Sequence, residues 1–338
     1  LLSPGPREVI SVYTAMHGVG GAVFMKAAAA AGFPDPHPVV EQFSPDARFP
    51  TVPFPNPEEP GAMDLSMAEA RRVNADIVVA NDPDADRCAA AIPFEGGWRR
   101  LTGDEVGGLL GWWIAKRAQL AGVELSGVYA QSIVSGTLLA KIAEWAGLEY
   151  QTTLTGFKWI SRVPGLVFGY EEALGYCVDP AGTRDKDGIT ATLLLLELAA
   201  HLKAEGRGVQ DVLDDLARRF GLHVTGQLAV RVSDLSIISD AMARLRAHPP
   251  KELGGREVLK CEDLLTGAGG LPPTDGLRFT MDGARVVIRP SGTEPKLKCY
   301  LQVVVAGTGD IVKARAAGAE ELKALYDSVD EALGITDV

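Results

Sequence analysis

Residues 75–88 read ADIVVANDPDADRC, a short apolar run followed by three aspartates at alternate positions, Asp82, Asp84 and Asp86. The apolar half is typical of a buried strand. Carboxylates so close together repel one another, so a compensating cation is expected. Three oxygen donors on alternating positions can converge on one hard divalent cation. The stretch therefore predicts a strand that leads directly into a metal-binding loop.

An EF-hand loop and a haloacid-dehalogenase nucleophile fit the three aspartates less well. In the EF-hand register, Arg87 stands at the position of the required glycine and Pro93 at that of the bidentate glutamate. A haloacid-dehalogenase nucleophile would need Thr or Val two residues after its second aspartate, and neither register supplies one. A solvated acidic turn stays open as an alternative. Arg87, directly after the acids, favours a site that handles phosphate as well as metal.

The segments around this loop alternate between strand and helix patterns. A strand is expected over residues 9–16, followed by the glycine-rich turn HGVGG and a helix that ends at Gly32. The proline-rich stretch 49–61 predicts a surface loop, and a helix is expected near residues 63–72. Thr102 and Glu105 have capping-box spacing and predict the start of another helix. We place the end of a first α/β domain near residue 125.

Two further domains are expected in the rest of the chain. Strands over 127–132, near Tyr150 and over 166–170 alternate with helices over 136–146 and 189–203, and residues 171–188 are expected to form a loop. After a bridging segment at 222–240, two strands joined by SGTE precede a helix at about 311–333. The predicted architecture is two consecutive α/β mixed-sheet domains, 1–125 and 126–225, and a smaller C-terminal α+β domain, 226–338.

Composition excludes several classes of protein. The 338 residues carry a formal net charge of −11, which argues against a general nucleic-acid or anionic-membrane binder. The chain contains no apolar run of 18 residues, so no membrane span is predicted. Four cysteines without a CxxC pair argue against a disulfide framework and favour the cytoplasm. The start lacks both an initiator Met and a signal-peptide pattern, so we expect a chain that begins in the middle of a longer protein.

A basic segment, RPSGTEPKLK at residues 289–298, contrasts with the acidic chain. Arg285, Arg289, Lys296 and Lys298 face Glu294 alone as countercharge. Ser291, Gly292 and Thr293 offer backbone N–H groups and two hydroxyls in a tight turn, a combination typical of an anion site. An ordinary hairpin turn is the alternative.

Weaker signals occur in three other loops. Glu171 and Glu172 end an apolar strand, where carboxylates could accept hydrogen bonds from sugar hydroxyls. Lys158 and Lys186 stand in glycine-containing loops suited to phosphate binding or proton transfer, although most lysines simply face water. The turn HGVGGAV lacks the third glycine of a dinucleotide fingerprint, because Val23 stands there.

Taken in order, TAMHGVG, NDPDADR, TGDE, TGFKWI, GYEEALGY, DKDG and RPSGTEPKLK closely resemble the α-D-phosphohexomutase superfamily, and within it the phosphoglucomutase/phosphomannomutase branch. The resemblance covers essentially the whole chain. It implies that Asp82, Asp84 and Asp86 bind Mg²⁺, with Arg87 beside the phosphoryl group. It further implies a C-terminal domain like the TATA-box-binding protein. The residues that it assigns to substrate are Thr155, Gly156, Glu171, Arg289, Ser291, Gly292, Thr293 and Lys296, and Lys158 and Lys186 are assigned to catalysis.

Two departures from the family pattern affect what is expected. Many members carry Ser two residues after the sugar-binding glutamate, where this chain has Ala173, so the hexose preference is open. The family's phosphoserine loop, TASHNP-like, is missing, because no serine here is followed by histidine. We therefore expect a fragment comprising the second to fourth of four family domains, inactive by itself.

The resemblance implies a mutase that interconverts hexose 1-phosphate and hexose 6-phosphate, of glucose or mannose, through phosphoserine and a bisphosphate intermediate. The expected partners are the hexose phosphate, a glucose 1,6-bisphosphate-type activator and the N-terminal domain of the same protein, in a monomer or a dimer. The alternatives are a phosphopentomutase or sugar-bisphosphate synthase of the superfamily, a truncated non-catalytic sugar-phosphate binder, and an unrelated Mg²⁺-dependent phosphatase.

Overall fold

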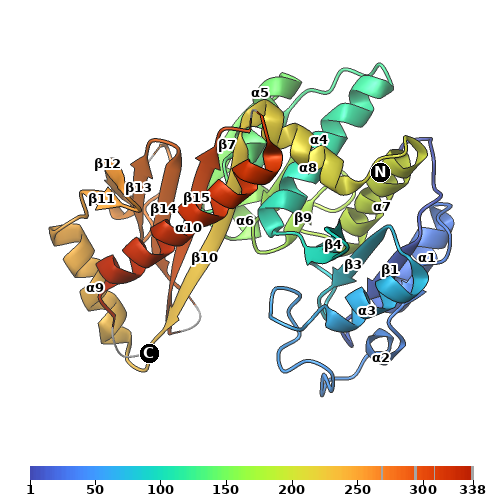
Figure 1. Cartoon of the computed structure of the whole chain (residues 1–338), viewed down its shortest axis with the longest axis horizontal. Coiled ribbons are helices and arrows are strands. Elements are labelled where there is room, and N and C mark those ends of the chain that lie inside the picture. Colours follow the sequence, from blue (N-terminus) through green and yellow to red (C-terminus); the bar gives the residue numbers. More distant parts are fainter. Residues whose placement is uncertain (268, 293–294, 308, 336–338) are drawn as a thin grey trace. The chain divides into compact units, whose positions relative to one another are not determined.

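The computed structural model describes residues 1–267, 269–292, 295–307 and 309–335. The chain divides into two compact units: residues 1–133 with 138–213, and residues 134–137 with 214–338. Among the described residues, the first unit contains two sheets and the second contains one (Figure 1). No described helix is both long and apolar enough to cross a bilayer.

The first sheet of the first unit has five strands in the order β2-β1-β3-β4-β5. Its strands are β1 (Ser11–Thr14), β2 (His37–Pro38), β3 (Ile77–Asn81), β4 (Cys88–Phe94) and β5 (Gly97–Arg100). Strand β1 pairs in parallel with β2 and β3, whereas β4 is antiparallel to both β3 and β5. All five residues of β3 are buried, as its unbroken apolar pattern predicts. The three aspartates follow β3 immediately.

The hairpin of β4 and β5 was not predicted from the sequence. Strand β4 begins with CAAAI, and alanine is a poor strand former whose preference is for helices. The strand nevertheless forms, because its buried residues pair in register with β3 from Asn81–Cys88 to Val78–Ala91. Tertiary burial therefore overrides local propensity here, and the aspartate loop becomes the connection between two antiparallel neighbours.

The second sheet of the first unit has the order β7-β6-β8-β9. Its strands are β6 (Val128–Ser132), β7 (Glu149–Thr153), β8 (Leu166–Glu171) and β9 (Gly175–Cys177). Strand β6 is parallel to β7 and β8, and β9 is antiparallel to β8. The prediction of an uninterrupted loop over 171–188 is wrong, because Leu174 adopts a φ of +66° and turns the chain back into β9.

The helices of the first unit include the five that were expected, and α2, α6 and α8, which were not predicted. They are α1 (Gly21–Ala30), α2 (Val40–Phe43), α3 (Asp64–Val73), α4 (Gly103–Leu120), α5 (Leu138–Ala146), α6 (Phe157–Ile160) and α7 (Gly188–Ala204), and α8 (Val209–Phe220) continues into the second unit. The predicted capping box is present: Glu105 N donates to Thr102 Oγ1 at 3.1 Å, and Thr102 N donates to Glu105 Oε2 at 2.8 Å. Helices α4 and α7 pack against strands of both sheets and join them.

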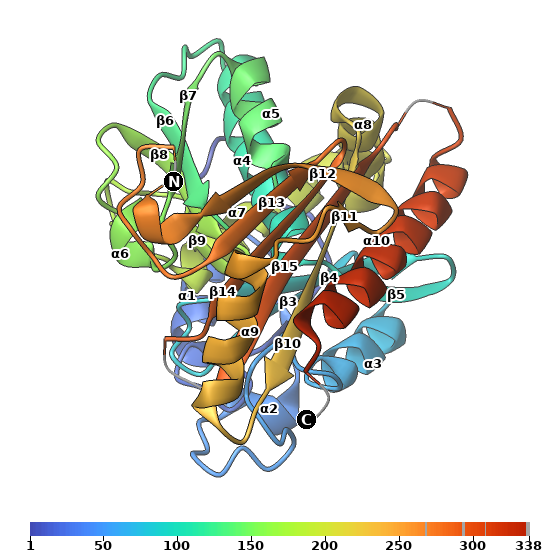
Figure 2. The same cartoon turned by 90° about the vertical axis from the view of Figure 1, so that its left-hand side faces the viewer.

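The second unit is built on an antiparallel sheet with the order β10-β15-β14-β13-β12-β11. Its strands are β10 (Leu222–Arg231), β11 (Glu252–Leu253), β12 (Arg256–Asp263), β13 (Leu277–Met281), β14 (Ala284–Pro290) and β15 (Lys296–Val305). Helices α9 (Leu235–Ala247) and α10 (Ile311–Leu333) cover one face of this sheet (Figure 2). Their apolar residues, such as Met242 and Val329, join the core formed by Phe279 and Val286.

The segment 222–240, expected to be a bridge, is instead strand β10 and the start of α9. Strand β10 pairs with β15 over ten residues, from Leu222–Val305 to Arg231–Lys296. Only one of its residues is fully buried, so the strand lacks the apolar alternation that sequence patterns reveal. The fold as a whole is the predicted one: two α/β mixed sheets followed by an antiparallel α+β unit.

Candidate functional site

The three aspartates form one cluster of oxygen atoms. One carboxylate oxygen from each of Asp82, Asp84 and Asp86 lies within 4.8 Å of the other two. Asp82 is buried, Asp84 is exposed and Asp86 is half-buried. Ala85 takes a φ of +58°, which turns the loop between the second and third acids. Oxygen donors in this number and spacing suit a hard divalent cation, so the cluster could hold one.

Two cations of the chain contact this acidic loop. The backbone N of Arg87 donates to Asp82 Oδ1 at 3.0 Å, and its Nε donates to Asp82 Oδ2 at 2.5 Å. Lys186, one hundred residues further on, forms an ion pair with Asp86 through Nζ. The fold therefore brings the predicted DKDG motif to the predicted metal loop.

Glycines from two motifs allow other backbone segments to approach this loop. Val19 N donates to Pro83 O at 2.8 Å, and a Cβ on Gly18 would lie 2.3 Å from Pro83 Cα. On the other side, Gly188 N donates to Ala85 O at 3.0 Å, and a Cβ on Gly188 would lie 2.2 Å from Arg87 O. Real Cβ atoms do not approach so closely, so both positions require glycine for space. The loop is thus held between the turn before α1 and the start of α7.

The second sheet positions the predicted sugar-binding residues. Glu171 ends β8, and its Oε1 accepts a hydrogen bond from Gly156 N at 2.5 Å. This contact joins the motifs GYEEALGY and TGFKWI and places Gly156, which follows Thr155, beside Glu171. Glu172 Oε2 accepts from Ser132 Oγ at 3.0 Å. Lys158 is exposed on α6, and its Nζ lies 5.8 Å from the centroid of the Trp159 ring.

Residues of the TGDE motif contact the end of β8 and the start of the loop that follows it, where Glu171 and Glu172 lie. A Cβ on Gly103 would lie 1.7 Å from Glu172 O, and Tyr170 Oη donates to Asp104 Oδ1 at 2.8 Å. Burial raises the pKa of Tyr170 well above its usual value of 10.0, so the phenol keeps its proton and remains a donor. Helix α4 therefore fixes the end of β8 on which Glu171 is carried.

Backbone hydrogen bonds connect the loop after β8 with the loop that carries the three aspartates. Cys88 N, directly after the aspartates, donates to Leu174 O at 3.0 Å. Asp187 N, directly after Lys186, donates to Tyr176 O at 2.9 Å. Two bonds between main-chain groups leave little freedom for one loop to move without the other. Within the first unit, the predicted metal-binding, sugar-binding and lysine motifs thus form one constellation.

The predicted phosphate loop belongs to the second unit. It joins β14 to β15: Arg289 pairs in register with Lys298, and Ser291 N donates to Lys296 O at 2.9 Å. Gly292 is exposed, and a Cβ there would have no neighbour within 4 Å. Thr293 lies outside the described residues. The basic side chains and the turn are therefore on one hairpin, and its binding of phosphate stays a prediction.

Sequence reasoning missed Asn56 at this site. It lies in the proline-rich stretch, which was predicted only as a surface loop, and its Oδ1 accepts a hydrogen bond from Arg87 Nη1 at 3.2 Å. The one local signal was an amide side chain placed between Pro55 and Pro57. Composition predicted the loop correctly but could not show which residue it would contact.

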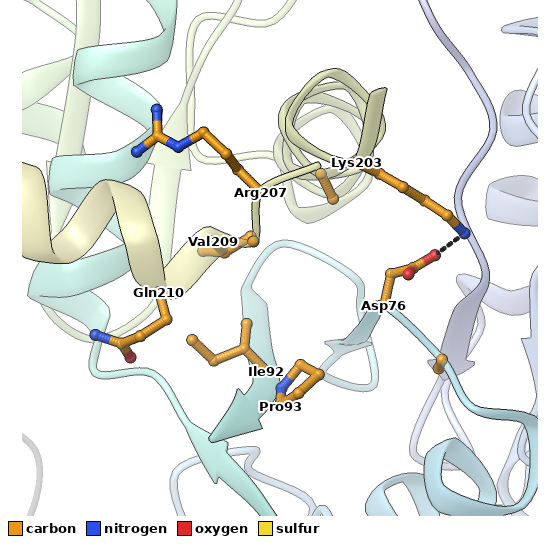
Figure 3. A pocket seen from close by; sticks show the side chains of 10 residues that line it. Asp76, Ile92, Pro93, Lys203, Arg207, Val209 and Gln210 are labelled. Carbon is orange, nitrogen blue, oxygen red and sulfur yellow. Dashed lines mark hydrogen bonds and ion pairs between the residues drawn. The ribbon is translucent and has the colours of Figure 1, made fainter. Parts of the chain in front are cut away.

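A separate pocket of about 170 Å³ lies elsewhere in the first unit (Figure 3). It is lined by Ile92 and Pro93 of β4, the start of α8, and the ion pair between Lys203 and Asp76, with Nζ–Oδ2 at 2.7 Å. None of the predicted site residues lines it. In Figure 3 the Arg207 guanidinium points away from the space enclosed by the other side chains. The pocket therefore has no evident part in the chemistry of the aspartate loop.

Sequence comparison divides the chain among three models of one family. Residues 6–94 match phosphoglucomutase/phosphomannomutase alpha/beta/alpha domain II, residues 102–220 match domain III, and residues 228–317 match the C-terminal domain. The predicted boundaries at 125 and 225 stay predictions.

Individual relatives agree with these matches. A probable phosphomannomutase of Haemophilus influenzae is 49% identical over 296 residues, which cover 87% of this chain and 60% of the relative. A phosphopentomutase of Homo sapiens is 34% identical over 356 residues, covering 96% and 57%. The chain thus spans about three fifths of the curated relatives it matches.

A solved structure shows the same fold. The crystal structure of a phosphomannomutase homologue from Thermus thermophilus aligns with a TM-score of 0.71 at 20% identity, covering 98% of this chain and 62% of that one. Together with the ordered matches to three domain models, the observed sheets and loops show that the chain belongs to the phosphoglucomutase/phosphomannomutase family.

Proposed function

We propose that this chain is the metal-, sugar- and phosphate-binding part of a mutase that interconverts hexose 1-phosphate and hexose 6-phosphate. The observation that carries the proposal is the joining of two distant motifs at one loop, where Arg87 contacts Asp82 and Lys186 contacts Asp86. Acids that can hold a metal, next to cations that can contact phosphate, are what phosphoryl transfer requires. The 49% identity to a probable phosphomannomutase supports the hexose assignment.

Mg²⁺ is the metal that the site residues fit best. The ligands would be Asp82, Asp84 and Asp86, whose oxygen atoms already lie within 4.8 Å of one another. When bound, the ion would neutralise negative charge that develops on the transferring phosphoryl group.

The chain's own residues would then position the substrate. Arg87 would donate hydrogen bonds to the phosphoryl oxygens through its planar guanidinium. Glu171 would accept from two sugar hydroxyls, and Lys186, which lies at the metal loop, is better placed than exposed Lys158 to exchange a proton there.

The hairpin of the second unit would hold the phosphate that does not react. Arg289 and Lys296 would supply charge, and Gly292 would supply a backbone N–H donor. A mutase must accept its substrate in two orientations, so such a site has to bind phosphate without regard to which sugar oxygen carries it. The phosphoserine that exchanges the phosphoryl group would come from an N-terminal domain of the same protein.

A pentose phosphate is the second candidate substrate. Relatives named phosphopentomutase are 34–36% identical and one named glucose 1,6-bisphosphate synthase is 33% identical. Ala173 supplies no hydroxyl beside Glu171, so the sugar would make one polar contact fewer than in a mutase with Ser at this position. Loss of one contact of this kind lowers discrimination between sugars.

A substrate panel tests the proposal. The protein that carries this chain is assayed with mannose 1-phosphate, glucose 1-phosphate and ribose 1-phosphate, each with Mg²⁺ and a trace of the matching bisphosphate. Conversion of a hexose 1-phosphate to its 6-phosphate supports the hexose assignment, whereas turnover of the pentose alone supports the second candidate. Asp84→Asn should abolish turnover, and Asp35→Asn, at an exposed loop position, is the matched control.

Experiments on the chain by itself test whether it binds substrate but needs a serine on another domain for turnover. It should bind Mg²⁺ and hexose 6-phosphate, measured by calorimetry, and convert none. Turnover by this polypeptide alone would refute the need for a serine on another domain. If the protein that carries the chain also binds but never converts any sugar phosphate, the non-catalytic binder is the better assignment.

A further inference from the structure

Arg87 is held at two points by side chains from two different parts of the first unit. Its Nε donates to Asp82 Oδ2 at 2.5 Å, and its Nη1 donates to Asn56 Oδ1 at 3.2 Å. Within the described part of the chain, Nη2 of Arg87 has no hydrogen-bond partner. The guanidinium is therefore fixed while one of its nitrogen atoms keeps its donors for another molecule.

The Asn56 side chain is itself held in place. Its Oδ1 also accepts from Glu58 N at 3.0 Å, which closes an Asx turn. Pro55 and Pro57 flank the residue and restrict its backbone, and Arg100 Nη1 donates to Pro57 O at 2.7 Å. The Asn56 amide oxygen is therefore held in position before it contacts Arg87, and little side-chain conformational entropy is lost when the contact forms.

The charge of the two acceptors differs in a way that suits phosphoryl transfer. Asp82 is a carboxylate, and in the proposed function it is also a metal ligand, so its oxygens are shared. Asn56 is neutral and holds the guanidinium without reducing its positive charge. A carboxylate in the place of Asn56 would compete with a phosphoryl group for the same cation.

We infer that Asn56 is a positioning residue that orients Arg87 toward the transferring phosphoryl group. The inference rests on the proposed function for the identity of that group. The contact between Asn56 and Arg87 can be tested without turnover.

Three variants of the chain separate the contact from the fold of its loop. Asn56→Ser keeps an oxygen that can accept from Glu58 N but is too short to reach Arg87. Asn56→Asp keeps the geometry and adds a negative charge. Glu59→Ser, at an exposed position of the same loop, is the matched control.

The rate at which phenylglyoxal modifies Arg87, measured by peptide mass spectrometry relative to exposed Arg71, is the first readout. An Arg87 side chain freed from Asn56 is more accessible to the reagent and reacts faster, whereas a guanidinium that forms an ion pair with a new carboxylate is held more firmly and reacts more slowly. Asn56→Ser should raise the rate about fivefold, which corresponds to one hydrogen bond of about 1 kcal/mol. Asn56→Asp should lower it, and Glu59→Ser should leave it unchanged.

Two results would overturn the inference in this first experiment. One is an Arg87 rate in Asn56→Ser equal to that of the control. The other is a rise in both Asn56 variants, which would mean that the loop has merely loosened.

Steady-state kinetics of the protein that carries this chain are the second readout. Asn56→Ser should lower kcat about tenfold and leave KM within about twofold, because the lost orientation matters in the transition state. An unchanged kcat would overturn the positioning role. If the wild type shows no mutase activity at all, the proposed function fails, and the modification rates still decide whether Asn56 holds Arg87.

Discussion

Lys186 forms an ion pair with Asp86 although one hundred residues separate them in the sequence. Asp187 and Gly188, which follow Lys186, are hydrogen-bonded to backbone groups at Tyr176 and Ala85. The start of α7 therefore places the Lys186 ammonium at the loop that carries the three aspartates. In the chain itself, Lys186 and Arg87 offset much of the charge of the three aspartates.

Substitution of Lys186 should change the affinity for Mg²⁺. A cation that pairs with a metal ligand competes with the metal, so Lys186→Met should bind Mg²⁺ more tightly. The pair is about one third exposed, and its loss should be worth about 1 kcal/mol, or about a fivefold lower Kd by calorimetry. Lys141→Met, which removes an exposed lysine from α5, is the control. Weaker Mg²⁺ binding in Lys186→Met would contradict the assignment of Asp86 as a metal ligand for which Lys186 competes.

The acidic residues should differ in what they contribute to stability. Asp84 is exposed and lies near two other carboxylates, so Asp84→Asn should abolish Mg²⁺ binding and leave the unfolding free energy of the metal-free chain unchanged or slightly higher. Asp82 is 2% exposed and accepts two hydrogen bonds from Arg87, so Asp82→Asn should cost about 1–3 kcal/mol. Urea unfolding with and without Mg²⁺ measures both effects. Equal destabilisation by the two substitutions would contradict the prediction that Asp82, and not Asp84, stabilises the metal-free chain.

Gly103→Ala should both destabilise the chain and disturb the loop after β8, which is proposed to bind the sugar. The added Cβ would lie 1.7 Å from Glu172 O, so either α4 or the end of β8 must move. Overpacking of this kind costs about 1–3 kcal/mol. Gly5→Ala, where a Cβ meets nothing within 4 Å, should change neither the melting temperature nor hexose 6-phosphate binding. A normal affinity in Gly103→Ala would show that Glu172 and its neighbours do not contribute to binding.

Stability should fall steeply at alkaline pH. Burial raises the pKa of Cys88, Cys177 and Cys299 from 9.0 to about 12. Between these two pKa values the unfolded chain loses thiol protons that the folded chain keeps. The free energy of unfolding therefore decreases as the pH rises. The slope approaches about 1.4 kcal/mol per pH unit for each such thiol once the unfolded thiols have titrated. Urea unfolding from pH 8 to pH 10.5 measures it. Cys88→Ala should reduce the slope, and an unchanged slope would contradict the prediction.

Most of the fold could be predicted from local patterns in the sequence. The apolar run before Asp82 identified β3, and the spacing of Thr102 and Glu105 identified the first turn of α4. The patterns failed where burial decides against local preference. The alanines of β4 prefer a helix by themselves, and β10 has no clear apolar face, so neither strand was predicted.

The candidate site could be predicted only in part, for a related reason. Each motif was visible by itself, because carboxylates, lysines and glycines in short loops are conspicuous in a sequence. Their mutual contacts depend on packing between elements far apart in the chain, such as α7 against the loop after β3. Asn56 shows the limit most clearly, because nothing near it in sequence indicates Arg87 as its partner.

The most direct test of the proposed function is a ³¹P NMR time course of mannose 1-phosphate with the protein that carries this chain, Mg²⁺ and a trace of mannose 1,6-bisphosphate. A mutase predicts that the mannose 1-phosphate signal declines while that of mannose 6-phosphate grows, with no inorganic phosphate released. Accumulation of inorganic phosphate, without formation of mannose 6-phosphate, would contradict the mutase assignment and indicate a phosphatase.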